Sequence, residues 1–189
     1  MALANPAYSG QTAPEGRHGA TETARIAALI VDDNAHMRAI VATLLHALGI
    51  NETRQAADGA EARAVLAHWR PDLVVVDQNM RPVSGTEFAR TLRRNSENCY
   101  DTPIIMLTAH TERAIVEAAR DSGIDEILAK PISAKALLQR LHAVTHERRS
   151  FVRAGDYVGP DRRRRSSVNY MGPRRRESDA WGENTYSLE

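Results

Sequence analysis

Short apolar runs alternate with stretches of helical spacing between about residues 25 and 147, and this pattern is the strongest constraint on the fold. A strand buried on both faces appears in a sequence as such a run, and helices that cross between such strands build a parallel sheet. Helical spacing of apolar residues, or residues typical of helix ends, predicts five helices at about 34–48, 61–69, 85–94, 111–122 and 133–147. The sequence therefore predicts an α/β fold, a doubly wound five-stranded parallel sheet of order 2-1-3-4-5.

Four of the apolar runs end on polar residues, namely Asp32-Asp33, Asp77, Thr108 and Lys130. The carboxyl ends of parallel strands meet at one edge of the sheet, and the predicted order places the first and third strands side by side. Carboxylates brought together raise one another's pKa unless a cation neutralises them, so a divalent ion with oxygen ligands is expected. The nearby lysine and threonine point to a bound phosphoryl group.

Each of these residues also has a simpler interpretation. Asp32 and the residues after it could cap a helix, Thr108 could do the same, and Lys130 before a proline could be a solvated loop residue. All of these accidents would have to fall on the same sheet edge, which favours a shared functional site.

The residues resemble the receiver domain of two-component response regulators, a flavodoxin-like fold, over about residues 25–147. The resemblance is carried by the Asp32-Asp33 pair, the segment Asp77-Gln78-Asn79-Met80 running on to Gly85, the Thr108-Ala109 pair and the Lys130-Pro131 pair. It implies that Asp77 is the phosphoacceptor and that Thr108 and Lys130 contact the phosphoryl oxygens. It also implies a Mg²⁺ ion held by Asp32, Asp33, Asp77 and the backbone carbonyl of Asn79.

The resemblance further implies a signalling phosphoprotein that catalyses only its own phosphorylation and dephosphorylation. The expected partners are a sensor histidine kinase or histidine phosphotransfer protein and a downstream protein target, and a phosphorylation-dependent dimer stays open. Ile127 departs from the family, in which an aromatic residue at this position rotates inward, so we expect the switch to depend on Thr108 and the fourth helix. Arg81-Pro82 stands where the family has a proline directly after Met80. Asn79 and His110 are expected to flank the path of the hydrolysing water.

The 189 residues suit one domain with tails, and we expect a flexible leader at 1–24, the receiver at 25–147 and an arginine-rich tail at 148–189. The single cysteine excludes an internal disulfide framework. The sequence contains no apolar run that could span a bilayer and no signal peptide, and a cytoplasmic protein is expected.

The tail repeats one motif after thirteen residues: Tyr157-Val158-Gly159-Pro160 is followed by Tyr170-Met171-Gly172-Pro173, each with arginines after it. We interpret Tyr-x-Gly-Pro as a turn with an aromatic anchor, and the repeat as two docking elements for the receiver's own acidic face or for a partner.

The leading functional hypothesis is a stand-alone response regulator that signals by protein contacts. A nucleic-acid-associated regulator using the arginines is the alternative, although the tail is too short for a helix-turn-helix domain and nucleic-acid binding is disfavoured. A pseudo-receiver adaptor is a further alternative. A phosphatase-type hydrolase ranks last, because Asp77-Gln78-Asn79 offers no second acid at the usual two-residue spacing.

Overall fold

The computed structural model describes residues 26–95 and 99–162. Five parallel strands form one sheet in the order β2-β1-β3-β4-β5, which confirms the predicted fold. Their bounds are β1 Ala27–Val31, β2 Glu52–Ala56, β3 Leu73–Asp77, β4 Ile104–Thr108 and β5 Glu126–Ala129. In this register Asp77 lies beside Leu107, and Thr108 lies beside Ala129, so the polar strand ends meet at one edge.

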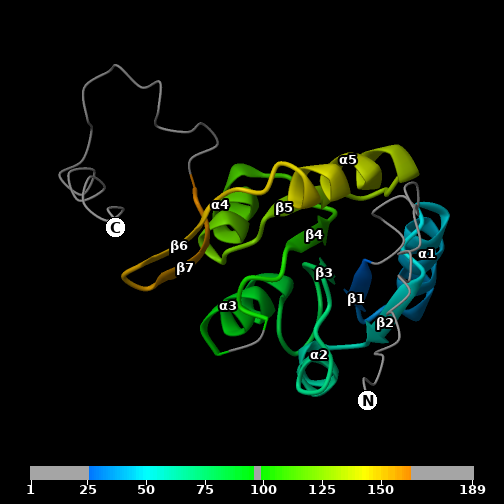
Figure 1. Cartoon of the computed structure of the whole chain (residues 1–189), viewed down its shortest axis with the longest axis horizontal. Helices are drawn as coiled ribbons and strands as arrows, with labels where there is room; N and C mark the ends of the chain where they lie inside the picture. The colour runs from blue at the N-terminus through cyan, green and yellow to red at the C-terminus, as the bar shows by residue number, and fades with distance from the viewer. Residues whose placement is uncertain (1–25, 96–98, 163–189) are drawn as a thin grey trace, which may run out of the picture.

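Helices cover both faces of the sheet (Figure 1). Their bounds are α1 Ala35–Ala47, α2 Gly59–Leu66, α3 Gly85–Asn95, α4 Arg113–Asp121 and α5 Ala134–Thr145. One core cluster joins the sheet to α2, α3 and α4 through residues such as Phe88 and Ala119, and the other joins it to α1 and α5 through Leu45 and Leu137. The central strands β1, β3 and β4 are buried along their whole length because helices cover both faces of the sheet. The edge strand β2 is mostly polar and exposed.

The helix starts follow the sequence, with one correction. Asn34 and Ser133 accept hydrogen bonds from the first turns of α1 and α5. The predicted helix of about 61–69 lies at Gly59–Leu66 instead, because Asp58 is its N-cap and accepts the N–H groups of Ala60 and Glu61.

A two-stranded antiparallel hairpin follows α5, with strands β6 Phe151–Ala154 and β7 Tyr157–Pro160. The interpretation of Tyr157–Pro160 as a turn is therefore wrong. The chain reverses at Gly155-Asp156, where Gly155 has φ +56°. The first tail motif docks on the receiver, whereas the leader 1–24 and the second motif lie outside the described residues.

None of the helices within residues 26–95 and 99–162 is both long and apolar enough to cross a membrane.

Candidate functional site

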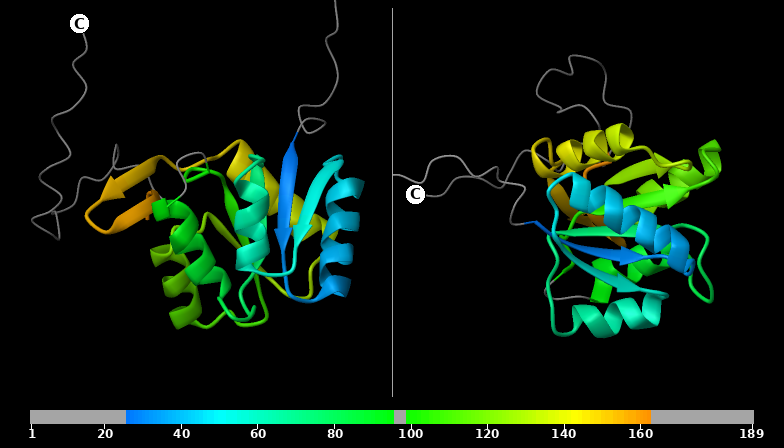
Figure 2. Two further views of the ribbon diagram at one scale, coloured as in Figure 1. Left: turned by 90° about the horizontal axis from the view of Figure 1, so that it is seen from below. Right: turned by 90° about the vertical axis from the view of Figure 1, so that its right-hand side faces the viewer.

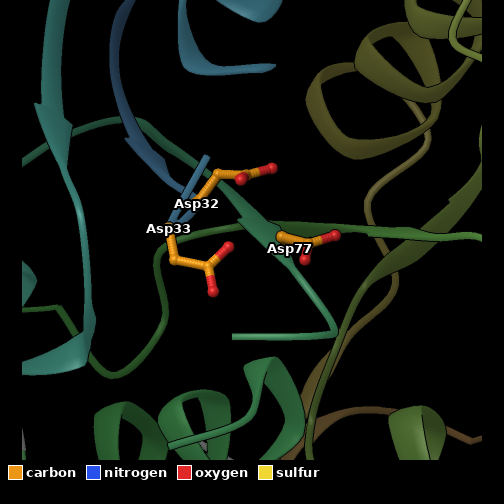
Figure 3. A group of neighbouring side chains, drawn as sticks. All are labelled: Asp32, Asp33 and Asp77. Carbon is orange, nitrogen blue, oxygen red and sulfur yellow. The ribbon is translucent and has the colours of Figure 1, made fainter. Parts of the chain in front are cut away.

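Three carboxylates gather at the carboxyl ends of β1 and β3 (Figure 3). Asp32 and Asp33 follow β1, Asp77 is the last residue of β3, and one oxygen atom of each lies within 4.8 Å of those of the other two. Asp32 and Asp77 are buried, at 1% and 4% exposure, whereas Asp33 is exposed. The pairing of β1 with β3 brings these residues together, as the predicted strand order requires.

Backbone groups fix the orientation of the two buried carboxylates. Asp32 Oδ1 accepts the N–H of Asn34 at 2.8 Å, and Asp77 Oδ2 accepts the N–H of Asn79 at 2.9 Å. Arg38, which the sequence analysis missed, donates from Nη1 to the backbone carbonyl of Asp32 at 2.7 Å. Its position one turn into α1 is the signal that could have identified it. The carboxylates are thus held in place before any ligand binds.

Lys130 reaches this cluster from the loop after β5. Its Nζ lies 2.8 Å from Asp77 Oδ1 and 3.5 Å from Asp32 Oδ2. Partial burial disfavours the charged ammonium, but the hydrogen bonds and negative charges of Asp77 and Asp32 outweigh it and raise the pKa of Lys130. Lys130 therefore stays charged beside the carboxylates.

The pKa of Asp32 is raised, chiefly because burial disfavours its charged form and also because Asp77 adds a second negative charge. The hydrogen bond from Asn34 and the charge of Lys130 act in the opposite direction without cancelling this effect. A buried carboxylate that is costly to ionise alone gains most from a cation placed beside it.

Thr108, the last residue of β4, is completely buried and bonded to its own loop. Its hydroxyl donates to the carbonyl of His110 and accepts the N–H of the same residue, each at 3.0 Å. The imidazole of His110 is more than half exposed and lies 3.7 Å from a carboxylate oxygen of Glu112. Thr108 is at the predicted edge, but its hydroxyl is engaged with the loop that leads to α4.

The loop after Asp77 is packed tightly enough to require a glycine. A Cβ on Gly85 would lie 2.4 Å from the backbone oxygen of Asp77, closer than any side chain can approach. A reciprocal capping box between Ser84 and Glu87 fixes the start of α3 at this point, and the Ser-x-x-Glu spacing could have predicted it. Asn79 and Arg81 are exposed in the same loop.

The donor set suits a small hard cation. Three carboxylates supply oxygen ligands only, and Mg²⁺ prefers oxygen ligands while retaining several waters. Burial and, to a smaller extent, the neighbouring Asp77 raise the pKa of Asp32, and a cation bound beside it would favour its charged form. The residues present therefore fit a divalent ion of this kind.

Sequence comparisons identify relatives of the part of the chain that carries this site. A family model described as the response regulator receiver domain matches residues 28–142. The phosphate regulon transcriptional regulatory protein PhoB of Pseudomonas aeruginosa is 40% identical over 116 residues, which are 61% of this chain and 50% of PhoB. The chemotaxis protein CheY-3 of Vibrio cholerae is 35% identical over 116 residues, which are 61% of this chain and 88% of CheY-3. The chain thus spans about half the length of PhoB and most of CheY-3.

Solved structures of receiver domains and chemotaxis proteins resemble this fold. CheY4 of Vibrio cholerae matches with a TM-score of 0.58 and 36% identity, over 63% of this chain and 98% of that one. The receiver domain of the sensor histidine kinase PA1611 from Pseudomonas aeruginosa, which carries a magnesium ion in its active-site cleft, matches with a TM-score of 0.56 and 28% identity, over 62% and 94%. With the five-stranded order, the acidic cluster and the family match over residues 28–142, this chain belongs to the response regulator receiver domain family.

Proposed function

We propose that this protein is a phosphoacceptor in phosphorelay signalling, with Asp77 receiving a phosphoryl group from a phosphohistidine of a sensor kinase or phosphotransfer protein. The observation that carries the proposal is the convergence of Asp32, Asp33, Asp77 and Lys130 at one sheet edge. Family membership supports a role in two-component signalling, while the relatives' names range from a phosphate regulon to chemotaxis and so leave the pathway open.

The chemistry is a displacement at phosphorus. A carboxylate oxygen of Asp77 attacks, a P–O bond forms as the P–N bond to histidine breaks, and the leaving imidazole takes the electron pair. A carboxylate is a weak nucleophile, so the rate depends on positioning and on neutralising the phosphoryl oxygens. The N–H of Asn79 holds one Asp77 oxygen, and the Lys130 ammonium lies 2.8 Å from the other, ready to contact the incoming phosphoryl group.

Mg²⁺ would be held by Asp32, Asp33, Asp77 and the backbone carbonyl of Asn79, and it would supply charge neutralisation to the phosphoryl oxygens. Thr108 would contribute a hydrogen bond once its hydroxyl turns from His110 toward the phosphoryl group. The protein would catalyse only its own phosphorylation and dephosphorylation, and its output would pass to a downstream protein.

Intact-mass spectrometry after incubation with a small acyl phosphate and Mg²⁺ tests the proposal. We expect one phosphoryl adduct in the wild type, and no adduct in Asp77→Asn or in the presence of a chelator. Glu117→Gln is the matched control, because it removes one exposed carboxylate of α4 that pairs with Arg113 away from the site. An adduct in Asp77→Asn at the wild-type level would disprove the assignment, as would a wild type that binds Mg²⁺ yet takes no phosphoryl group.

A further inference from the structure

The β6–β7 hairpin lies outside the span that matches the family model, and it packs beside α3 and α4 (orange in Figure 2), whereas Asp77 is the last residue of β3. It contacts α3 and the segment that joins α4 to β5. This position places an added element against the receiver without covering Asp77.

An aromatic contact and a backbone contact seat the hairpin. The ring of Phe151 lies 5.3 Å from the guanidinium of Arg93 and meets the ring of Tyr100 edge-on at 5.6 Å. Gly159 lies directly on Gly123, since a Cβ added to Gly159 would be 2.7 Å from the Gly123 Cα. No side chain separates these backbones, so the segment after α4 and β7 are in direct contact.

The last residue of α4 also touches the start of the arginine run. Arg162 Nη1 lies 3.6 Å from Asp121 Oδ1, and the Arg162 guanidinium lies 3.9 Å from the centre of the Tyr157 ring. The hydroxyl of Tyr157 donates to the carbonyl of Pro160 at 2.6 Å, which closes the end of the hairpin around this contact. In the sequence Arg162 is the first of four consecutive arginines. The carboxyl end of α4 therefore contacts the first arginine of that run through Asp121.

The amino end of α4 is tied to the phosphorylation site. Thr108 donates its hydroxyl hydrogen to the His110 carbonyl, and Glu112, the N-cap of α4, makes no side-chain capping bond. A hydroxyl has one hydrogen, so Thr108 cannot keep this bond and also donate to a phosphoryl oxygen on Asp77. Engagement of a phosphoryl group would therefore release one of the bonds that hold the loop before α4.

We propose that α4 couples the phosphorylation site to the hairpin, so that phosphorylation of Asp77 loosens the hairpin and its contact between Asp121 and Arg162. This inference rests on the proposed function. The nine-residue helix is the rigid connection, held by the Thr108 loop at one end and by Gly123 and Asp121 at the other.

Hydrogen exchange of the full chain, read by mass spectrometry over residues 151–161 with and without a small acyl phosphate and Mg²⁺, tests the coupling. Intact mass is recorded on the same samples. We expect a several-fold faster exchange in the phosphorylated protein and no change in Asp77→Asn. An adduct without faster exchange would overturn the coupling and leave the proposed function intact. Absence of an adduct in the wild type would overturn both.

A pair of α4 variants separates this coupling from general loosening. Asp121→Asn removes the charge that Arg162 contacts. This pair is exposed and Asp121 also pairs with Arg120 at 3.1 Å, so we expect hairpin exchange without any phosphodonor to rise by no more than about five-fold. Glu117→Gln removes an equal charge from the same helix. The Glu117 carboxylate pairs with Arg113 and not with the hairpin, so this variant should keep the wild-type response. Hairpin exchange in unphosphorylated Asp121→Asn that equals the wild type would show that the contact between Asp121 and Arg162 is not part of the coupling.

Discussion

Replacement of Arg93 by methionine should destabilise the protein strongly. The Arg93 side chain is 1% exposed and donates to the carbonyls of Gly123, Tyr100 and Thr102 at 2.7 to 2.9 Å. It also pairs with Asp125 at 2.8 Å. Methionine keeps much of the apolar stem but offers no donor, so three carbonyls and one buried carboxylate lose a partner at once.

The expected magnitude follows from the uncompensated charge. Removing one partner of a buried ion pair costs about 3–5 kcal/mol, because the other charge stays buried. Domains have total stabilities of about 5–15 kcal/mol, so the loss is a large fraction of the whole. With a urea slope of about 2 kcal/mol per molar, the unfolding midpoint of Arg93→Met should fall by about 2 M. Circular dichroism during urea titration measures this shift.

Two variants make the prediction specific. Arg94→Met alters the exposed neighbour, which donates to the carbonyl of Asp156 at 3.1 Å, and should cost less than about 1 kcal/mol. Asp125→Asn combined with Arg93→Met removes the orphaned charge and keeps an acceptor for the N–H of Ile104, which Asp125 binds at 2.8 Å. The double variant should therefore be less destabilised than the sum of the single changes, by about 1–3 kcal/mol. Strict additivity, or a loss below about 1 kcal/mol in Arg93→Met, would refute the reasoning.

Three further predictions concern the phosphorylation site. Gly85→Ala should lower the free energy of unfolding by about 1–3 kcal/mol, since its Cβ would meet the Asp77 backbone oxygen at 2.4 Å, and an unchanged melting temperature would contradict this. The pKa of Asp32 is raised from 3.8, so as the pH falls this carboxylate is protonated before an ordinary aspartate would be. Titration calorimetry should therefore show that Mg²⁺ affinity begins to fall at a higher pH than it would for a site made of ordinary aspartates. Lys130→Met should slow phosphorylation by a small donor about 10²- to 10³-fold, measured by intact mass over time. Mg²⁺ affinity should be kept, because the variant loses a cation that competes with Mg²⁺ for the carboxylates. A wild-type rate of phosphorylation would exclude the role of Lys130.

The sequence predicted that Asp32, Asp33, Asp77 and Lys130 lie at one edge of the sheet, where the structure places them. Asp77, Thr108 and Lys130 each follow an apolar run, and in a parallel sheet the order of the strands then determines which ends are neighbours. The sequence could not show that Thr108 is bonded to His110 or that Lys130 lies on Asp77. These contacts depend on side-chain rotamers, which carry no periodic signal in the chain.

The segment Tyr157–Pro160 was predicted as a turn and is a strand, because glycine and proline occur at close backbone contacts and at edge strands as well as in turns. Gly159-Pro160 suggested a turn, yet Gly159 serves the close approach to Gly123, and Pro160 ends an edge strand where no hydrogen-bonded N–H is needed. The actual turn uses Gly155, whose φ of +56° lies in the left-handed region. Arg93 was not singled out, because a charged residue in a helix is usually solvated and only its tertiary partners reveal its burial.

The two tail motifs are not equivalent in sequence. With the thirteen-residue offset, Val168 stands where the first copy has Gly155, and Arg164 stands where it has Phe151. A β-branched residue disfavours the left-handed turn, and arginine cannot reproduce the edge-on ring contact with Tyr100. The second motif therefore lacks two residues that the first uses in its hairpin, and its predicted role as a docking element lies outside the described residues.

The hairpin offers an output route that does not need an aromatic residue at position 127, where this chain has Ile127. Ile127 is partly buried against the core cluster shared by the sheet and α4, so β5 presents no ring that could turn between two positions. Contact with α4 is instead made directly, through Asp121 and the glycine pair at Gly123 and Gly159. An output carried by the hairpin would need no rotating side chain on β5. The same exchange experiment distinguishes the two routes, because a hairpin output changes residues 151–161, whereas an output through β5 would change residues 126–129.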